Sequence, residues 1–307
     1  MDLVPRLGSG IPLFAREREL DQLRAAFERA DNGDAAAILL AGDAGVGKSR
    51  LLGELAEWAQ ARGALVLTGR CLDIGETGLP YLPFAEALSR IGGDDLTAVR
   101  SRPALGRLLP SLELPRLADR VPQQPPALAE MRAVPQRDVG QLQLFDAVLG
   151  LLGELAERRP VLLVVEDLHW ADPSTRDLLS FLLSRLHEQR ILVVASYRSD
   201  DLHRSHPLRP LLAELVRMPV LQRLDLAPFS PTQARGFVTA LAEDQLPDDV
   251  VADIAKRSDG NPFFAEELLA AYAECDQAGM PPALADVLLA RVESLPARTR
   301  KVIRLAS

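Results

Sequence analysis

Eight consecutive residues carry the most recognisable chemistry in this chain. They read Gly42-Asp43-Ala44-Gly45-Val46-Gly47-Lys48-Ser49 and fit the spacing G-x-x-x-x-G-K-[ST]. The three glycines, Gly42, Gly45 and Gly47, permit backbone conformations closed to other residues, so that consecutive N–H groups can turn inward onto phosphate oxygens. Lys48 supplies a positive charge for the β- and γ-phosphates, and the Ser49 hydroxyl can ligate Mg²⁺. The pattern predicts a loop that binds ATP or ADP with Mg²⁺. Arg50, the next residue along, is also predicted to bind the nucleotide.

The residues around this loop provide the context that the motif requires. An apolar run over 36–41 precedes the loop and predicts a strand that is covered on both faces. Apolar side chains at helical spacing follow it, up to a stop signal at Arg62 and Gly63. A helix that begins near Lys48 directs the positive end of its dipole at the same phosphates. The alternative is a glycine turn of no special function, and the combined motif and context favour nucleotide binding.

A second apolar run, over 161–165, ends in two acids, Glu166 and Asp167. A buried strand of a parallel sheet delivers such carboxylates to the edge where ligands bind. There one carboxylate can hold Mg²⁺ and another can polarise an attacking water molecule. The alternative is a strand that happens to end in solvated acids. Because Lys48 and Ser49 are also present, the pattern favours a catalytic function for the acids.

The remaining elements indicate the architecture that positions these residues. Further apolar strands are predicted over 64–68, 191–195 and 220–226, alternating with helices over 13–30, 84–91, 139–158, 172–186 and 208–216. Strands that alternate with helices are typical of an α/β fold with a parallel sheet. In the helix over 139–158, Leu142, Phe145, Leu149 and Leu152 are expected on one face. Prolines rule out long regular elements over 92–139. Only short helical turns are predicted there, at 105–109 and 112–117.

The chain changes character near residue 228. Three helices are predicted over 230–241, 247–257 and 261–273, and no strand pattern returns. The predicted domains are therefore a disordered leader over 1–12, an α/β core over 13–227 and a small helical domain over 228–294. Residues 295–307 begin another amphipathic helix, so the chain is expected to be a fragment of a longer protein.

Composition limits the classes of function. The 307 residues carry a net charge of −8 and no basic stripe, which argues against direct nucleic-acid contact by this segment. The two cysteines have no metal-type spacing and indicate a reducing compartment. No secretory segment or apolar run of membrane-spanning length is expected, so the sequence predicts a cytoplasmic protein.

Several segments taken together resemble a known family. They are Phe14–Leu20, the loop 42–49, VVEDLHWAD over 164–172, Ser196–Arg198 and Gly260–Phe263. The set is similar to the STAND-class signal-transducing ATPases, and most like the AAA-type ATPase region of large LuxR-type bacterial transcriptional regulators. The same module accompanies some class III adenylyl cyclases and serine/threonine kinases. The resemblance covers residues 14–307, nearly the whole chain.

The resemblance implies a fold and a set of roles. The fold would be a P-loop NTPase with a three-layer αβα core, a parallel sheet and an extra strand between the loop strand and the acidic strand. The helical domain would be a lid, and residues 295–307 would begin a winged-helix domain. The roles carried over are phosphate and Mg²⁺ binding for Lys48 and Ser49, Mg²⁺ binding for Glu166, water orientation for Asp167, phosphate sensing for Arg198, adenine contact for Pro262, and lining of the nucleotide by Arg16 and Glu17.

The chain departs from the family pattern at two positions. Ala15 replaces the usual glycine before Arg16, so the approach of that segment to the nucleotide is expected to differ. Glu166 stands where many members have aspartate, and its longer reach is expected to weaken or slow the Mg²⁺ chemistry. His169 and Trp170 match the pattern and are interpreted as packing residues.

Three functions follow from this reading. The first is a nucleotide-controlled switch with slow hydrolysis, in which ADP holds the lid closed and ATP favours an open form that associates with itself. The second is a turnover ATPase of the AAA type, and the third is a scaffold without catalysis. The four residues Lys48, Ser49, Glu166 and Asp167 argue against the scaffold. The switch is favoured, with sensor and effector domains expected beyond this segment.

Overall fold

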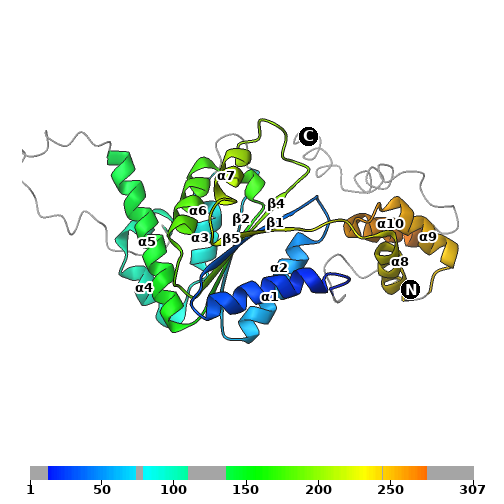
Figure 1. Ribbon diagram of the computed structural model, residues 1–307, viewed down its shortest axis with the longest axis horizontal. Coiled ribbons are helices and arrows are strands. Elements are labelled where there is room, and N and C mark those ends of the chain that lie inside the picture. The colour runs from blue at the N-terminus through cyan, green and yellow to red at the C-terminus, as the bar shows by residue number, and fades with distance from the viewer. Residues whose placement is uncertain (1–12, 74–78, 110–135, 244, 275–307) are drawn as a thin grey trace, which may run out of the picture. The chain divides into compact units, whose positions relative to one another are not determined.

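The computed structural model describes residues 13–73, 79–109, 136–243 and 245–274 (Figure 1). The predictions for the leader over 1–12, the helical turn at 112–117 and the segment 295–307 lie outside the described residues. The chain divides into two compact units. The sheet unit contains Arg18–Gly42 and Leu51–Asp225, and the helical unit contains the described parts of Met1–Glu17, Asp43–Arg50 and Leu226–Ser307. Each unit is described by itself.

A five-stranded sheet organises the sheet unit (Figure 1). Its strands are β1 (Ala36–Gly42), β2 (Leu65–Arg70), β3 (Val161–Glu166), β4 (Ile191–Arg198) and β5 (Leu221–Asp225). All pairings are parallel, and the spatial order is β2-β3-β4-β1-β5. Because β4 lies between β1 and β3, the extra strand between the loop strand and the acidic strand is confirmed. The α/β fold class is confirmed with it.

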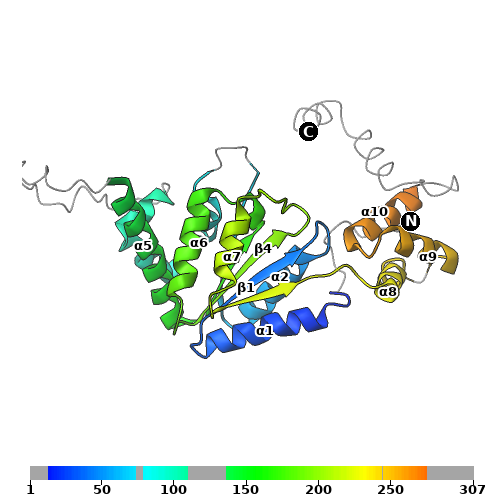
Figure 2. The same ribbon diagram turned by 45° about the horizontal axis from the view of Figure 1, so that its top comes forward.

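Helices cover both faces of the sheet, which gives the three predicted layers (Figures 1 and 2). One face carries α1 (Glu17–Asp31) and α2 (Lys48–Ala61), and the other carries α3 (Leu82–Ser89), α5 (Gln136–Arg158), α6 (Pro173–Arg185) and α7 (Leu208–Leu215). Strands β1, β3 and β4 are buried almost throughout, since both of their faces are covered. Residues 92–109 form the short helix α4 (Leu96–Arg100) flanked by single 3₁₀ turns, as the prolines suggest.

The buried face of α5 differs from the predicted one. Leu142 is 54% exposed, whereas Leu144, Val148, Leu151 and Leu155 are buried together with Phe145 and Leu152. The buried residues repeat every three or four positions, as on one face of a helix. The predicted apolar face was therefore wrong at its N-terminal end, where Leu144 and not Leu142 is buried. Among the described helices, Val139–Arg158 is long and apolar enough to cross a membrane, judged by length and composition alone. Its buried side chains belong to the hydrophobic core, and the core helix of a soluble protein passes the same test.

The helical unit has its own small core. It contains α8 (Pro231–Leu241), α9 (Asp248–Arg257) and α10 (Pro262–Glu274), which correspond to the three predicted helices. Phe229, Phe237, Ile254 and Leu268 are buried within it. Phe14 packs on this core, with its ring centroid 6.0 Å from that of Phe229 and 5.7 Å from that of Phe237. The N-terminal segment therefore packs with helices that are more than 200 residues away in sequence. The predicted boundaries at 12, 227 and 294 stay predictions.

Candidate functional site

In the sheet unit, the predicted site residues lie where parallel strands end. Strand β1 ends at Gly42, opposite Arg198 at the end of β4, and β3 ends at Glu166. Because the carboxyl ends of parallel strands meet at one edge, Gly42, Glu166 and Arg198 share that edge of the sheet. Strand β4 continues past its apolar run through Ser196 and Tyr197, so Arg198 lies at the tip of the strand, where the sequence predicts it.

Asp167 follows β3 in a conformation that is unusual for a residue other than glycine. Its φ of 58° and ψ of 44° are left-handed, which an aspartate tolerates better than most residues. The Asp167 N–H donates to Ser196 Oγ at 3.3 Å, and its C=O accepts from the Trp170 N–H at 2.9 Å. These bonds fix the backbone from both sides, so the carboxylate leaves the chain in a defined direction just after Glu166. Backbone strain of this kind is often found at functional sites.

Arg70 pairs with both acids. It ends β2 directly opposite Glu166 in the sheet, with its Nη2 3.3 Å from Glu166 Oε1 and its Nε 3.6 Å from Asp167 Oδ2. The two carboxylates are largely buried, whereas the Arg70 side chain is 48% exposed. The sequence interpretation missed this residue because it ended the strand at Thr68. The strand register of the structure reveals it, because two further residues of β2 place an arginine opposite the first acid.

The side chain of Arg198 is held by groups from two loops. Its guanidinium lies 5.0 Å from the ring centroid of Trp170 and 3.7 Å from Asp201 Oδ2. The Arg198 N–H donates to His169 Nδ1 at 3.4 Å, and His169 Nε2 lies 3.5 Å from Asp201 Oδ2. His169 and Trp170 thus pack against the end of β4 and orient the residue predicted to sense phosphate.

A buried thiol adjoins the acids but is unsuited to catalysis. Burial, reinforced by the negative charges of Asp172 and Asp167, raises the pKa of the Cys71 thiol from its ordinary value of 9.0 to about 12. The group stays protonated at neutral pH and is a poor nucleophile. Among the described residues, no group of three or more His, Cys, Asp or Glu side chains could hold a metal ion.

In the helical unit, the phosphate loop shows the geometry its sequence predicts at two of its three glycines. Gly45 and Gly47 have φ values of 76° and 103°, in the left-handed region. Gly42, expected to need the same freedom, is instead the last residue of β1 and is extended. Lys48 is 8% exposed and its Nζ donates to the Asp43 C=O at 2.8 Å, while α2 begins at this residue. The cradle, the ammonium group and the helix N-terminus together fit an anionic phosphate chain.

Two other predicted residues of the helical unit lie beside this loop. The Arg16 Nη2 donates to the Val46 C=O at 3.3 Å and to the Ala227 C=O at 2.7 Å. Pro262 is buried and begins α10, and Asn261, the residue before it, donates through Nδ2 to the Ala44 C=O at 2.8 Å. Glu17 is exposed at the start of α1. Sequence reasoning overlooked Asn261, although it is part of the G-N-P-F segment.

The structure therefore groups the predicted residues in two sets. Gly42, Glu166, Asp167 and Arg198 gather at one edge of the sheet unit. The second set belongs to the helical unit and consists of Arg16, Glu17, the loop residues Asp43, Ala44, Gly45, Val46, Gly47, Lys48, Ser49 and Arg50, and Pro262. Their roles toward nucleotide and Mg²⁺ stay predictions.

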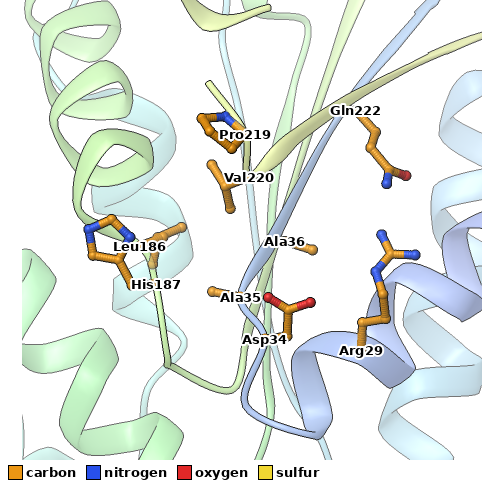
Figure 3. Close-up of a pocket in the computed structure, with 9 residues that line it drawn as sticks. All are labelled: Arg29, Asp34, Ala35, Ala36, Leu186, His187, Pro219, Val220 and Gln222. Atoms are coloured by element: carbon orange, nitrogen blue, oxygen red, sulfur yellow. The ribbon is translucent and has the colours of Figure 1, made fainter. Parts of the chain in front are cut away.

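A cavity of about 280 Å³ lies elsewhere in the sheet unit (Figure 3). Figure 3 shows Arg29, Asp34, His187 and Gln222 around it, close to the residues that begin β1 and β5. Ligands of parallel α/β sheets bind outside the carboxyl ends of the strands. The cavity lies at the opposite ends, so it is not part of the predicted nucleotide site.

Comparisons with known proteins agree with this geometry. A family model described as AAA ATPase domain matches residues 12–194. The uncharacterized protein R02095 of Rhizobium meliloti (strain 1021) is 29% identical over 234 residues, which are 69% of this chain and 22% of that protein. The chain thus spans about a fifth of the length of this curated relative.

Solved structures share the fold at low sequence identity. The Walker-type ATPase PABY2304 of Pyrococcus abyssi matches with a TM-score of 0.54 and 15% identity, covering 95% of this chain and 76% of that one. The Aeropyrum pernix Orc1 protein, solved in complex with DNA, matches with a TM-score of 0.51 and 19% identity, covering 95% and 72%. At these identities the likeness concerns the fold alone.

Proposed function

Because the chain belongs to the AAA ATPase domain family, we propose that it is the ATPase module of a signalling protein and acts as a nucleotide-dependent switch. In this proposal, bound ADP keeps the helical lid closed, and exchange for ATP shifts the population toward an open form. Hydrolysis is slow and returns the module to the ADP-bound form. The motifs that resemble STAND-class ATPases support this assignment over a motor that hydrolyses ATP continuously.

The predicted residues other than Arg50 each have a defined part in the proposed chemistry. The N–H groups of the loop and the Lys48 ammonium bind the phosphates, and Ser49 and Glu166 hold Mg²⁺. When bound, Mg²⁺ neutralises phosphate oxygens on which negative charge develops. Asp167 orients and polarises the attacking water, and Arg198, supported by Trp170 and Asp201, senses the γ-phosphate. Pro262, Arg16 and Glu17 line the nucleotide.

The observation that carries the switch is the direct linkage between the phosphate loop and the C-terminal helices. Asn261, which precedes α10, donates to a carbonyl of the loop at 2.8 Å. A ligand that binds the loop therefore binds a segment that is hydrogen-bonded to the residue preceding α10. A ligand can shift a conformational equilibrium only through such a difference in interaction between the two states.

The wider context of the module is also a proposal. The chain covers 22% of its curated relative, which leaves room for sensor and effector domains in a longer protein. We favour a cytoplasmic LuxR-type transcriptional regulator in which ATP promotes self-association. The alternative is the regulatory module of an adenylyl cyclase or kinase. With a net charge of −8, this segment is expected to leave any nucleic-acid contact to another domain.

The nucleotide carried by the purified protein tests the switch. The protein is denatured, and released nucleotide is identified by chromatography. Near-stoichiometric ADP supports a closed, ADP-bound switch. A protein that is empty and then hydrolyses added ATP rapidly contradicts the switch and favours a turnover ATPase.

Asp167→Asn separates binding from hydrolysis. The amide keeps the size of the side chain but cannot act as a base, so ATP binding is expected to persist while phosphate release falls by about 100-fold or more. Calorimetry measures the first quantity and a phosphate-release assay the second. Undiminished phosphate release would assign the catalytic function to another residue.

A further inference from the structure

Three consecutive carbonyl groups of the phosphate loop accept hydrogen bonds from outside the loop. Asn261 Nδ2 donates to the Ala44 C=O at 2.8 Å, and the Phe263 N–H donates to the Gly45 C=O at 3.3 Å. Arg16 Nη2 donates to the Val46 C=O at 3.3 Å. The donors come from the N-terminal segment and from the start of α10. We call these three donors, Arg16 Nη2, Asn261 Nδ2 and the Phe263 N–H, the carbonyl clamp.

The orientation of a carbonyl also fixes that of an amide. In a planar trans peptide, the C=O of one residue and the N–H of the next point in opposite directions. The described peptide bonds are all trans. Holding the carbonyls of Ala44, Gly45 and Val46 outward therefore directs the next three N–H groups to the other side. The Val46 N–H donates within the loop, to the Asp43 C=O at 3.4 Å.

These N–H groups are the ones that a glycine-rich loop offers to phosphates. We propose that the carbonyl clamp positions the amides of the phosphate loop, so that docking of α10 sets the affinity for the phosphate chain of ATP or ADP. This inference rests on the proposed nucleotide-binding function and adds its regulation. Movement of α10 away from the loop removes two of the three donors and loosens the amides. The lid then controls nucleotide release through the phosphates as well as through any contact with the base.

The Asn261 side chain forms hydrogen bonds with both the helix α10 and the phosphate loop. Its Oδ1 accepts from the Phe263 N–H at 3.1 Å, as an N-cap residue does for the helix that follows. The cap requires the amide oxygen to face the helix, so the Nδ2 group faces the Ala44 carbonyl. Aspartate can replace the cap but carries no donor when ionised. Serine can also replace the cap, but its donor and acceptor share one oxygen that lies one bond nearer the backbone than Nδ2, so it has no second donor at the position of Nδ2.

Gly45 gives independent support for this docking. The motif G-x-x-x-x-G-K leaves position 45 open to any residue, yet this chain has glycine there. A Cβ atom at Gly45 would lie 2.8 Å from Asn261 Oδ1 and 2.8 Å from Phe263 Cβ. The absence of a side chain therefore allows the start of α10 to approach the loop, besides permitting the φ of 76°.

Variants of Asn261 in the full chain test the proposal. Asn261→Ser keeps the cap and removes the donor, while Asn261→Asp keeps the cap and places a carboxylate against the Ala44 carbonyl. Calorimetry with Mg²⁺ measures the Kd of ADP and, separately, of pyrophosphate, which has no base. We expect about tenfold weaker binding of both ligands by Asn261→Ser and a greater loss with Asn261→Asp.

Ser230→Ala is the matched control. It removes the N-cap of α8 in the same unit, where Ser230 Oγ accepts from the Gln233 N–H at 3.3 Å. This substitution is expected to leave both Kd values unchanged, because the Ser230 hydroxyl accepts its hydrogen bond within α8 and not from the loop. Thermal unfolding of each variant checks that the lid remains folded.

The outcomes distinguish the clamp from the function on which it rests. If the wild-type protein binds neither ADP nor pyrophosphate, the proposed function fails, and the clamp with it. If the wild type binds both and a folded Asn261→Ser protein binds them equally well, the clamp alone is overturned. Weaker binding of ADP with unchanged binding of pyrophosphate would also overturn it, since Asn261 would then act through the base.

Discussion

Arg70 determines the charge of the acid pair, Glu166 and Asp167, at which Mg²⁺ binding is proposed. Its guanidinium lies within 3.6 Å of both carboxylates and would therefore compete with a cation for them. Because the Arg70 side chain is 48% exposed, solvent screens the interaction and its strength is modest. If Glu166 holds Mg²⁺ as proposed, Arg70 is expected to limit its affinity for the metal and so to slow hydrolysis.

Arg70→Ala is expected to lower the Mg²⁺ concentration for half-maximal ATP hydrolysis by about threefold, since one competing charge is removed. Phosphate release measured over a Mg²⁺ titration gives this value. Arg235→Ala is the control, because Arg235 pairs with Asp248 in the helical unit, at 3.2 Å, and not with the acids. An unchanged or higher Mg²⁺ requirement in Arg70→Ala would show that the guanidinium orients the acids instead of competing for them.

For single residues, the sequence predicts a function where the motif consists of consecutive residues. The loop 42–49 and the acids after 165 are recognised because local spacing alone defines them. The residues that hold these groups come from distant segments. Arg70 reaches Glu166 across 96 positions, and Asn261 reaches Ala44 across 217. No local pattern encodes such pairs, so Arg70, Ser196 and Asn261 required the folded chain.

The segment before α1 contains a strained residue. Ala15 has a φ of 51°, which costs an L-residue with a Cβ about 1 kcal/mol. Glycine adopts this conformation without that cost. This agrees with the glycine that STAND-class ATPases, which the sequence resembles, usually have at this position. Phe14 on one side packs on the helical core and Arg16 on the other holds the loop, so these contacts keep Ala15 in place.

Ala15→Gly is therefore expected to stabilise the protein. Relief of the left-handed strain outweighs the greater flexibility of glycine in the unfolded chain, for a net gain of about 0.5 kcal/mol in the free energy of unfolding. Urea unfolding or Tm measures the change. The same substitution at exposed Ala25, inside α1, should instead destabilise by about 1 kcal/mol. Lower stability in Ala15→Gly would contradict the strain argument.

Elements were predicted best where burial dictates their pattern. The strands that are covered on both faces, β1, β3 and β4, are continuous apolar runs and begin where the sequence indicated. Their ends were less certain, because Arg70 and Arg198 are polar residues that the strand register, and not hydropathy, keeps in the sheet. In α5 the exposed Leu142 misled the choice of face, since leucine at helical spacing fits two adjacent stripes.

The whole molecule groups its residues differently from their order in the chain. The phosphate loop belongs to the same compact unit as Phe14, Arg16 and the C-terminal helices. Sequence patterns place the loop between β1 and α2, and give no indication that its carbonyls are held from α10. This grouping is the physical basis on which we link nucleotide binding to the lid.

The central claim is that this loop binds nucleotide phosphates, and Lys48→Ala tests it most directly. Calorimetric titration of ADP and ATP with Mg²⁺ is performed on wild-type, Lys48→Ala and Lys256→Ala proteins. Lys256 is an exposed lysine of α9, so its substitution controls for the loss of one positive charge. We predict that the wild type and Lys256→Ala bind both nucleotides and that Lys48→Ala binds neither. Wild-type affinity in a folded Lys48→Ala protein would contradict the account.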